Sequence, residues 1–334
     1  MRPNHLLLCL LLAVATVSGC ASTGAKQEQQ LANRTVVVTG ASSGFGRGIA
    51  TRLAANQANV VLVARSAEAL DEIAREFKGS TLVVPADVGR PEDIERVTRE
   101  TVARFGRIDV WINNAGVGAL GRFEDIPLED QLRLVNVNFD GVIMGSYHAL
   151  RQFRTQGSGI LINIGSVEGR VPVPYQATYV ATKHAVVGLG AALNQELRLA
   201  NLKNIHVVTV NPWATDTPFF VHAANYTGRS PRSILLDPPD KVVDAVIGAI
   251  LKPHDHEIAV GYKAKTAQAS ERITRSLTDT ATAALYHQAQ MEDPPPAPPT
   301  SGILHEGAAS GGANVSGGNV ARISAEESSQ EGEK

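Results

Sequence analysis

Cysteine is scarce in this chain of 334 residues, and its two copies, Cys9 and Cys20, both stand close to the N-terminus. Everything downstream lacks the thiols that a disulfide framework or a cysteine-ligated zinc site requires. The nine histidines include no pair at the four-residue spacing with which one helix face binds zinc. We therefore expect no catalytic metal.

A strong excess of one charge is also missing. The 31 Lys and Arg residues nearly balance the 33 Asp and Glu residues, which gives a net charge of −2. A nucleic-acid partner would favour a basic stripe or patch, so we exclude nucleic acid as a partner. The length predicts one catalytic domain with additional segments.

The apolar run from Leu6 to Val17 is too short to span a bilayer comfortably and is typical of a signal-peptide core. It leads into Val17-Ser18-Gly19-Cys20, which resembles a bacterial lipobox with Cys20 as the lipid-modified residue. The pattern predicts a lipid anchor and a membrane-associated protein.

Two boundaries follow from this interpretation. We expect residues 1–20 to form a leader and residues 21–30 a polar tether. The alternative is a gene model that begins too early, with translation from near Leu31 and a cytoplasmic protein.

The C-terminal segment, residues 292–334, is rich in proline at its start and in glycine, serine and alanine afterwards, and it has no aromatic residue. Such a composition buries too little apolar surface to offset the entropy of ordering, so we expect a disordered tail. Its acidic end favours a solubilising role, and partner binding is the alternative. The acidic residues are Glu326, Glu327, Glu331 and Glu333.

Between these segments, short β-branched runs alternate with helical patterns, which predicts an α/β fold with a doubly wound parallel sheet. We expect strands at 35–39, 59–63, 82–85, 109–112, 160–164, 206–210 and 257–260. We expect helices from residue 47 and at 67–77, 92–105, 128–153, 175–199 and 240–251. One Rossmann-like domain would then cover residues 31–262, followed by a helical extension over residues 263–291.

A glycine-rich turn follows the first predicted strand. The turn reads Gly40-Ala41-Ser42-Ser43-Gly44-Phe45-Gly46, and a helical pattern follows it. Strand, glycine turn and helix together are the context in which backbone amides bind a pyrophosphate. The sequence therefore predicts a dinucleotide site here.

A second pattern is Tyr179-Val-Ala-Thr-Lys183, with Ser166 upstream. Residues four apart on a helix share a face, so an ammonium lies beside a phenol. The nearby positive charge favours phenolate and lowers the phenol pKa from about 10. Such a tyrosine can move a proton to or from a carbonyl or alcohol oxygen, which a serine hydroxyl beside it can hold.

Together with Asn113-Asn114-Ala115-Gly116 and Asn138, these motifs resemble the short-chain dehydrogenase/reductase family over roughly residues 31–262. The resemblance implies a nicotinamide cofactor and hydride transfer at a carbonyl or alcohol carbon. It implies that Tyr179 is the acid/base, that Lys183 lowers its pKa and holds the nicotinamide ribose, and that Ser166 orients the substrate oxygen. Asn138 would anchor a water molecule in the proton relay. A homo-oligomer is expected on the same ground.

The resemblance also implies a set of cofactor contacts that spans the domain. These are Gly40, Ser42, Ser43, Gly44, Phe45, Gly46, Arg65, Asp87, Val88, Asn114, Ala115, Gly116, Tyr179, Lys183, Pro212 and Thr215.

Two positions depart from the family pattern. Trp213 follows Pro212 where glycine is usual, so the indole either points away from the nicotinamide end or forms a wall of the substrate site. Gly165 precedes Ser166 where serine is usual, and the catalytic serine remains.

The end of the second predicted strand bears on cofactor choice. It reads Val63-Ala64-Arg65, with alanine where an acidic residue would hold the ribose 2′-hydroxyl of NAD. A guanidinium binds a 2′-phosphate through two parallel bonds, whereas a carboxylate repels it. We therefore expect NADP(H) rather than NAD(H), with Arg47 as a further candidate contact or a solvated charge.

Three loops should enclose the substrate, at residues 117–123, 168–175 and 213–226. Their apolar members favour a lipophilic carbonyl or secondary alcohol, and they are Leu120, Phe123, Val171, Val173, Trp213, Phe219, Phe220 and Val221. The polar exceptions, which could contact a polar substituent or face solvent, are Arg122, Glu168, Arg170 and His222. An inactive nucleotide-binding scaffold, or a membrane-tethered one, is the alternative to an enzyme.

Overall fold

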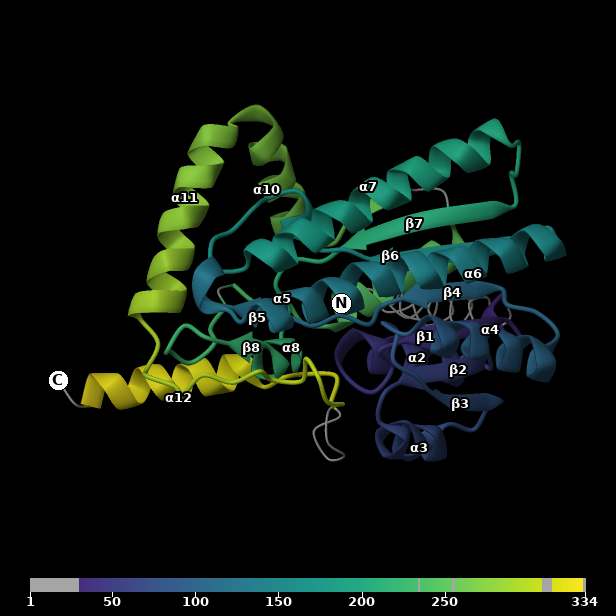
Figure 1. Ribbon diagram of the computed structural model, residues 1–334, viewed down its shortest axis with the longest axis horizontal. Coiled ribbons are helices and arrows are strands. Elements are labelled where there is room, and N and C mark those ends of the chain that lie inside the picture. The colour runs from purple at the N-terminus through teal and green to yellow at the C-terminus, as the bar shows by residue number, and fades with distance from the viewer. Residues whose placement is uncertain (1–29, 234, 254–255, 308–313, 333–334) are drawn as a thin grey trace, which may run out of the picture.

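The computed structural model describes residues 30–233, 235–253, 256–307 and 314–332. The expected leader and nearly all of the tether lie outside these residues. Seven parallel strands form one sheet in the order β3-β2-β1-β4-β6-β7-β9 (Figure 1). They are β1 (Thr35–Thr39), β2 (Asn59–Ala64), β3 (Thr81–Pro85), β4 (Val110–Asn113), β6 (Gly159–Ile164), β7 (Ile205–Asn211) and β9 (Glu257–Ala259).

Helices cover both faces of this sheet, which confirms the doubly wound fold. One face packs against α2 (Gly44–Ala55), α3 (Ala67–Glu76) and α9 (Asp240–Leu251). The other packs against α4 (Pro91–Phe105), α6 (Gly141–Gln156) and α7 (Ala177–Leu199). Each strand can support a helix layer on both sides because its successive side chains point to opposite faces.

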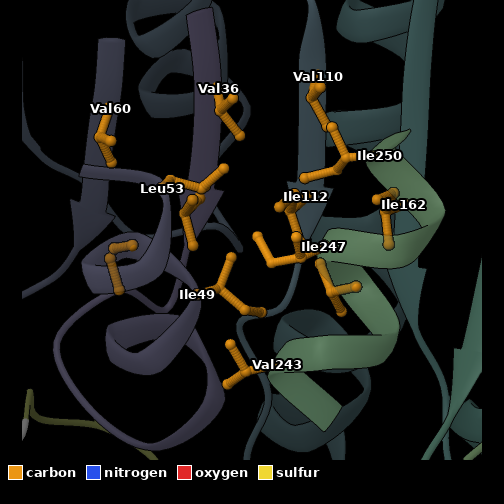
Figure 2. Packing of buried hydrophobic residues seen from close by; sticks show 14 of the residues in the cluster. Val36, Ile49, Leu53, Val60, Val110, Ile112, Ile162, Val243, Ile247 and Ile250 are labelled. Carbon is orange, nitrogen blue, oxygen red and sulfur yellow. The ribbon is translucent and has the colours of Figure 1, made fainter. Parts of the chain in front are cut away.

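The core is divided by the sheet into two apolar layers. Val36 faces the α2 and α9 side, whereas Val37 faces the opposite side. Figure 2 shows Ile49 of α2 and Ile247 of α9 close to Ile112 of the sheet. Continuous valine and isoleucine runs are what a parallel strand covered on both faces requires.

The helix expected over 128–153 is interrupted. It consists of α5 (Leu128–Val135), a π-helical turn (Asn136–Asp140) and α6. The wider turn adds one residue to the helical period and so redirects the side chains within it. Asn138 lies in this turn and points into the interior of the domain, with 1% of its surface exposed.

A second, two-stranded sheet joins two loops at the mouth of the domain. β5 (Ala119–Leu120) pairs in parallel with β8 (Ala224–Asn225), which follows the short helix α8 (Phe219–His222). Neither strand has a sequence signal, because two residues are too few to show alternation.

The helical extension forms α10 (Gly261–Ile273) and α11 (Arg275–His287), which project together from one end of the sheet (Figure 1). Among the described residues, no helix has both the length and the apolar character needed to cross a membrane.

The tail differs from the expected disorder in its described parts, residues 292–307 and 314–332. Leu304 is fully buried in the apolar core beside the sheet. The last described helix is α12 (Asn319–Gly332), shown in yellow in Figure 1. Arg322 of α12 donates hydrogen bonds to Ser230 Oγ at 2.6 Å and to the Pro231 carbonyl. The tail's composition leaves it little to bury against itself, whereas here it packs against the finished domain.

Candidate functional site

A cleft opens at the carboxyl ends of the central strands, where the strand order reverses between β1 and β4. Ligands of open α/β sheets bind at such a switch point. The expected site residues that line it are Gly40, Ser42, Ser43, Gly44, Phe45, Arg65, Asp87, Val88, Asn114, Ala115, Gly116, Ser166, Tyr179, Lys183, Pro212 and Thr215. Gly46 and Asn138 do not line the cleft but support the segments that do.

The end of β1 and the glycine-rich turn are held beside β4 by hydrogen bonds to Asn114, which follows that strand. Asn114 Nδ2 donates to the Thr39 carbonyl at 2.8 Å, and the Asn114 amide donates to Thr39 Oγ1 at 2.9 Å. A Cβ at Gly46 would lie 2.1 Å from the Gly40 carbonyl oxygen. Because no side chain fits there, the turn can bring α2 directly against β1 and present its first-turn amides to the cleft.

Ser166, Tyr179 and Lys183 come together as the motif predicts. Ser166 follows β6 and caps the short 3₁₀ helix Val167–Gly169, while the other two lie one turn apart on α7. All three are at least nine-tenths buried. The Ser166 hydroxyl is hydrogen-bonded to the Tyr179 phenol. Lys183 Nζ donates to the Ile164 carbonyl at 2.9 Å and lies 5.5 Å from the centre of the Tyr179 ring.

The expected lowering of the Tyr179 pKa is not what the structure produces. Burial raises the pKa of the Tyr179 phenol, the charge of Glu168 raises it further, and the hydrogen bond from Ser166 only partly opposes them. Burial also lowers the pKa of Lys183 to about 8, against the opposing charge of Glu168. The prediction was wrong because it weighed one neighbouring charge and neither desolvation nor the carboxylate.

Glu168 belongs to this cluster. From the sequence it was expected only as a polar residue of a substrate loop that could contact a substituent or face solvent. Its amide donates to Ser166 Oγ at 3.1 Å, and its side chain lines the cleft. Burial raises the pKa of the Glu168 carboxyl to about 7, while the charge of Lys183 opposes the rise. The site therefore holds an acid whose protonation changes near neutral pH.

Tyr286 of α11 is a residue that the sequence did not reveal. Burial raises the pKa of its phenol, and the charges of Glu168 and Tyr179 act in the same direction, so its hydroxyl lies within electrostatic range of both. The helical extension thus lies beside the cluster of Ser166, Tyr179 and Glu168. No local motif marks such a residue, because only the tertiary fold brings it near.

Asn138 fixes the loop that follows β4. Its Oδ1 accepts from the Val117 amide at 2.8 Å, and its Nδ2 donates to the Val117 carbonyl at 2.8 Å. Both bonds are buried. The expected role of Asn138 in holding a water molecule stays a prediction.

At the other end of the cleft, Arg65 does not point freely into the site. Its Nη1 donates to the Leu304 carbonyl at 2.9 Å and its Nη2 to the Ile303 carbonyl at 2.6 Å, both in the C-terminal segment. Asp87 is paired with Arg133. Arg47 is paired with Glu76 at 2.8 Å and does not line the cleft.

The three substrate loops contribute unequally. The first supplies only Val117 and Gly118 to the cleft, the second only Glu168. Arg170 instead forms a two-bond ion pair with Glu257, at 3.0 and 2.6 Å.

The third loop provides most of the wall. Its lining residues are Trp213, Ala214, Thr215, Thr217, Phe219, Phe220 and His222. The Trp213 indole is held by a hydrogen bond from its Nε1 to the Leu235 carbonyl at 3.0 Å. It forms part of the cleft wall, as one of the two expected orientations requires.

Gly165 has a structural reason. A Cβ at this position would lie 2.1 Å from Asn211 Oδ1 of the neighbouring strand. The side chain of the serine that is usual here would collide with that amide, so glycine is the residue that fits beside Asn211.

Comparisons with known proteins agree with this geometry. A family model described as short chain dehydrogenase matches residues 34–225. The uncharacterized oxidoreductase YxnA of Bacillus subtilis (strain 168) is 32% identical over 285 residues, which cover 83% of this chain and 79% of the relative.

Two solved structures extend the comparison. A 3-ketoacyl-(acyl-carrier-protein) reductase from Brucella melitensis, complexed with NADH, is 30% identical with a TM-score of 0.60, and the match covers 68% of this chain and 96% of that one. An alcohol dehydrogenase from the archaeon Thermococcus sibiricus, complexed with 5-hydroxy-NADP, is 27% identical with a TM-score of 0.59, covering 67% and 94%. The similar structures therefore include one bound to NADH and one bound to an NADP derivative.

Proposed function

Because the chain belongs to the short-chain dehydrogenase family of oxidoreductases, we propose that it uses NADP(H) to reduce a lipophilic carbonyl compound to a secondary alcohol. The observation that carries the proposal is the buried cluster of Ser166, Tyr179 and Lys183 at the end of a cleft that begins at the glycine-rich turn.

The residues of the cleft fit a dinucleotide. First-turn amides of α2 face one part of it, and the Lys183 ammonium and Tyr179 phenol face the other. The glycine-rich turn and Asn114 would hold the pyrophosphate side, and Lys183 the nicotinamide ribose. When bound, the nicotinamide supplies the hydride.

The protein's own residues supply the proton. Ser166 is held in place by the Glu168 amide, so its hydroxyl and the Tyr179 phenol can both donate hydrogen bonds to a carbonyl oxygen. As the carbonyl carbon gains hydride, its oxygen gains negative charge and takes the phenolic proton of Tyr179. A phenol is protonated at neutral pH, and burial raises the pKa of Tyr179 further, so the free site holds the proton that reduction requires.

The wall of the cleft supports a lipophilic substrate. Val117, Trp213, Phe219 and Phe220 present apolar surface beside the cluster, and the Tyr179 and Phe219 rings lie 5.5 Å apart. An apolar pocket with a few convergent polar groups favours a small organic ligand that is mainly apolar.

The test is consumption of NADPH with phenyl ketones of increasing size, using protein that has first been shown to bind NADPH by fluorescence. We expect turnover that rises with the apolar surface of the ketone. Tight NADPH binding without turnover of any ketone would favour the scaffold alternative.

Cofactor choice gives a separate prediction for Arg65→Ala. With Ala64 in place of an acidic residue, the guanidinium is the strand-end group suited to a 2′-phosphate, so its loss should weaken NADPH binding far more than NADH binding. We expect the dissociation constant for NADH divided by that for NADPH to fall by at least about tenfold.

Arg47→Ala is the matched control, since it removes an equal charge that is paired with Glu76 outside the cleft. The ratio should stay unchanged in this variant. If Arg65→Ala weakens both cofactors equally, Arg65 has no part in recognising the 2′-phosphate.

A further inference from the structure

Glu168 is a carboxyl group without an obvious purpose in the proton transfer. It lies in the 3₁₀ turn Val167–Gly169 directly after Ser166 and is 9% exposed. Within the described part of the chain, its Oε2 is buried and accepts no hydrogen bond. A buried polar atom without a partner costs free energy and calls for an explanation.

The local electrostatics sharpen the question. A negative charge beside Tyr179 opposes formation of the phenolate. No ion pair joins Glu168 to Lys183 in the described structure, and Lys183 Nζ donates to the Ile164 carbonyl. A hydrophobic residue would pack in the same turn without that penalty. Glu168 lines the cleft, so a turn of its side chain would bring the carboxylate to a hydrogen-bond donor on a bound molecule.

We propose that Glu168 determines substrate specificity by accepting a hydrogen bond from a hydroxyl group that the substrate carries beside its reacting carbonyl. The inference rests on the proposed carbonyl reduction and narrows it to hydroxy ketones with an apolar body. Ser166 and Tyr179 hold the carbonyl oxygen, Glu168 holds the neighbouring hydroxyl, and Phe219 and Trp213 contact the apolar part.

The test compares acetophenone with 2-hydroxyacetophenone in the wild type, Glu168→Gln and Glu168→Met. The readout is the ratio of kcat/KM for the two ketones, because the ratio cancels effects common to both. We expect the preference for the hydroxy ketone to fall at least about tenfold in Glu168→Met, which has no acceptor of comparable strength. It should fall less in Glu168→Gln, whose amide oxygen still accepts a weaker bond.

Two results would overturn the proposal. One is an equal change for both ketones in both variants, which is the behaviour of a merely structural residue. The other is a wild type that shows no preference beyond that of Glu168→Met. NADPH affinity, measured in parallel, should stay within about twofold in all three proteins.

A failure of the proposed function remains distinguishable. If the wild type binds NADP⁺ but turns over neither ketone, the role of Glu168 can still be tested by binding. The measurement is the rise in Tm of the NADP⁺ complex when each of the matched alcohols is added. Greater stabilisation by 1-phenylethane-1,2-diol than by 1-phenylethanol, lost in Glu168→Met, supports the inference, and equal stabilisation overturns it.

A different observation carries a second inference. Two stretches of the tail, residues 300–307 and 314–319, which we call the C-terminal strap, contact the end of the cleft where the 2′-phosphate and pyrophosphate would bind. The Arg65 guanidinium donates to the carbonyls of Ile303 and Leu304, and the Gly44 amide at the start of α2 donates to the Asn314 carbonyl at 2.9 Å. Ile303 and Gly307 also line the cleft.

The strap is anchored on both sides of these contacts. Leu304 is fully buried, and Thr300 pairs with Asn225 of β8 through two backbone hydrogen bonds. Asn319 Nδ2 donates to Asp216 Oδ1 at 2.9 Å and to the Thr217 carbonyl at 2.8 Å. These anchors hold the strap where its carbonyl groups compete with a cofactor for the Arg65 guanidinium and the Gly44 amide.

We infer that the C-terminal strap is autoinhibitory and that binding of NADP(H) displaces it. The strap satisfies Arg65 and Gly44 with neutral carbonyl oxygens, whereas the cofactor offers phosphate oxygens. A guanidinium and a phosphate carry opposite charges and can form two parallel hydrogen bonds, whereas a carbonyl offers the guanidinium only a dipole, so the cofactor can win this competition.

The first test is NADPH affinity in the full chain. Leu304→Ala removes the buried anchor and should tighten NADPH binding at least about threefold, because less strap must be displaced. Val320→Ala, at an exposed position of α12, is the control and should leave affinity unchanged. Unchanged or weaker binding in Leu304→Ala would overturn the inference.

The second test observes the displacement directly. The Leu304→Cys thiol should react slowly with a thiol reagent in the free protein and at least about tenfold faster with saturating NADPH, read by mass spectrometry at this residue. NADH, which lacks the 2′-phosphate, should accelerate the reaction less. Protection of the thiol by NADPH would mean that the strap closes over bound cofactor, contrary to the inference.

Discussion

Tyr179→Phe should lower kcat by roughly 10³-fold, within the range that a positioned general acid contributes. The substitution removes one oxygen and keeps the ring that packs 5.5 Å from Phe219, so the cleft should keep its shape. It removes the phenolic proton, which stays bound at neutral pH because burial raises the pKa of Tyr179, and which lies beside the Ser166 hydroxyl. Steady-state kinetics with a reducible ketone measure the effect.

Cofactor affinity is the control for this variant. The phenol is not among the groups at the phosphate end of the cleft, so the dissociation constant for NADPH should change by less than about threefold. Tyr286→Phe is a matched variant, because it removes a second phenol hydroxyl near Glu168. In the proposed mechanism this hydroxyl transfers no proton. Turnover retained in Tyr179→Phe, or lost equally in both variants, would refute the assignment of the acid.

Gly46→Ala should abolish cofactor binding and destabilise the fold. The new Cβ would stand 2.1 Å from the Gly40 carbonyl oxygen and 2.6 Å from Asn114 Nδ2, and Gly40 is backbone that cannot turn aside. Either the glycine-rich turn moves away from β4 or the Asn114 bond to Thr39 breaks. We expect a loss of about 3 kcal/mol in the free energy of unfolding, the upper range for overpacking.

Urea unfolding and NADPH titration measure the two effects together. Gly248→Ala provides the matched control, since that glycine lies within α9 and an added Cβ meets no atom within 4 Å. Alanine should stabilise that helix by about 1 kcal/mol and leave NADPH binding unchanged. A Gly46→Ala protein with wild-type stability and affinity would show that the turn is not as closely packed as described.

The central strands were predictable from the sequence because they are buried on both faces. The run Thr35–Thr39 forms β1 with the expected bounds, and α9 covers the expected range Asp240–Leu251. Runs of valine and isoleucine and a repeating apolar helix face are local patterns, so they can be recognised without knowledge of the tertiary structure. The cleft residues followed from motifs of the same local kind.

What could not be predicted depends on contacts between distant segments. The π-helical turn at Asn136–Asp140 lies inside a continuous helical pattern, and nothing in the pattern marks the extra residue. The pKa of Tyr179 depends on burial and on Glu168 as well as on its helical neighbour Lys183. Leu304 is ordered because it packs into an apolar cluster of the domain. The glycines and serines that flank it in the sequence give no sign of this packing.

The order of strands has a consequence for how the chain folds. β1 lies in the middle of the sheet, between β2 and β4, and its Val36 is in register with Val60 on one side and Val110 on the other. Parallel neighbours always require an intervening crossover, so loop closure must be completed before the pairing stabilises the chain. During synthesis, β1 therefore leaves the ribosome long before its second neighbour exists, and one of its edges stays open to chaperones, or to other nascent chains, until β4 has been made.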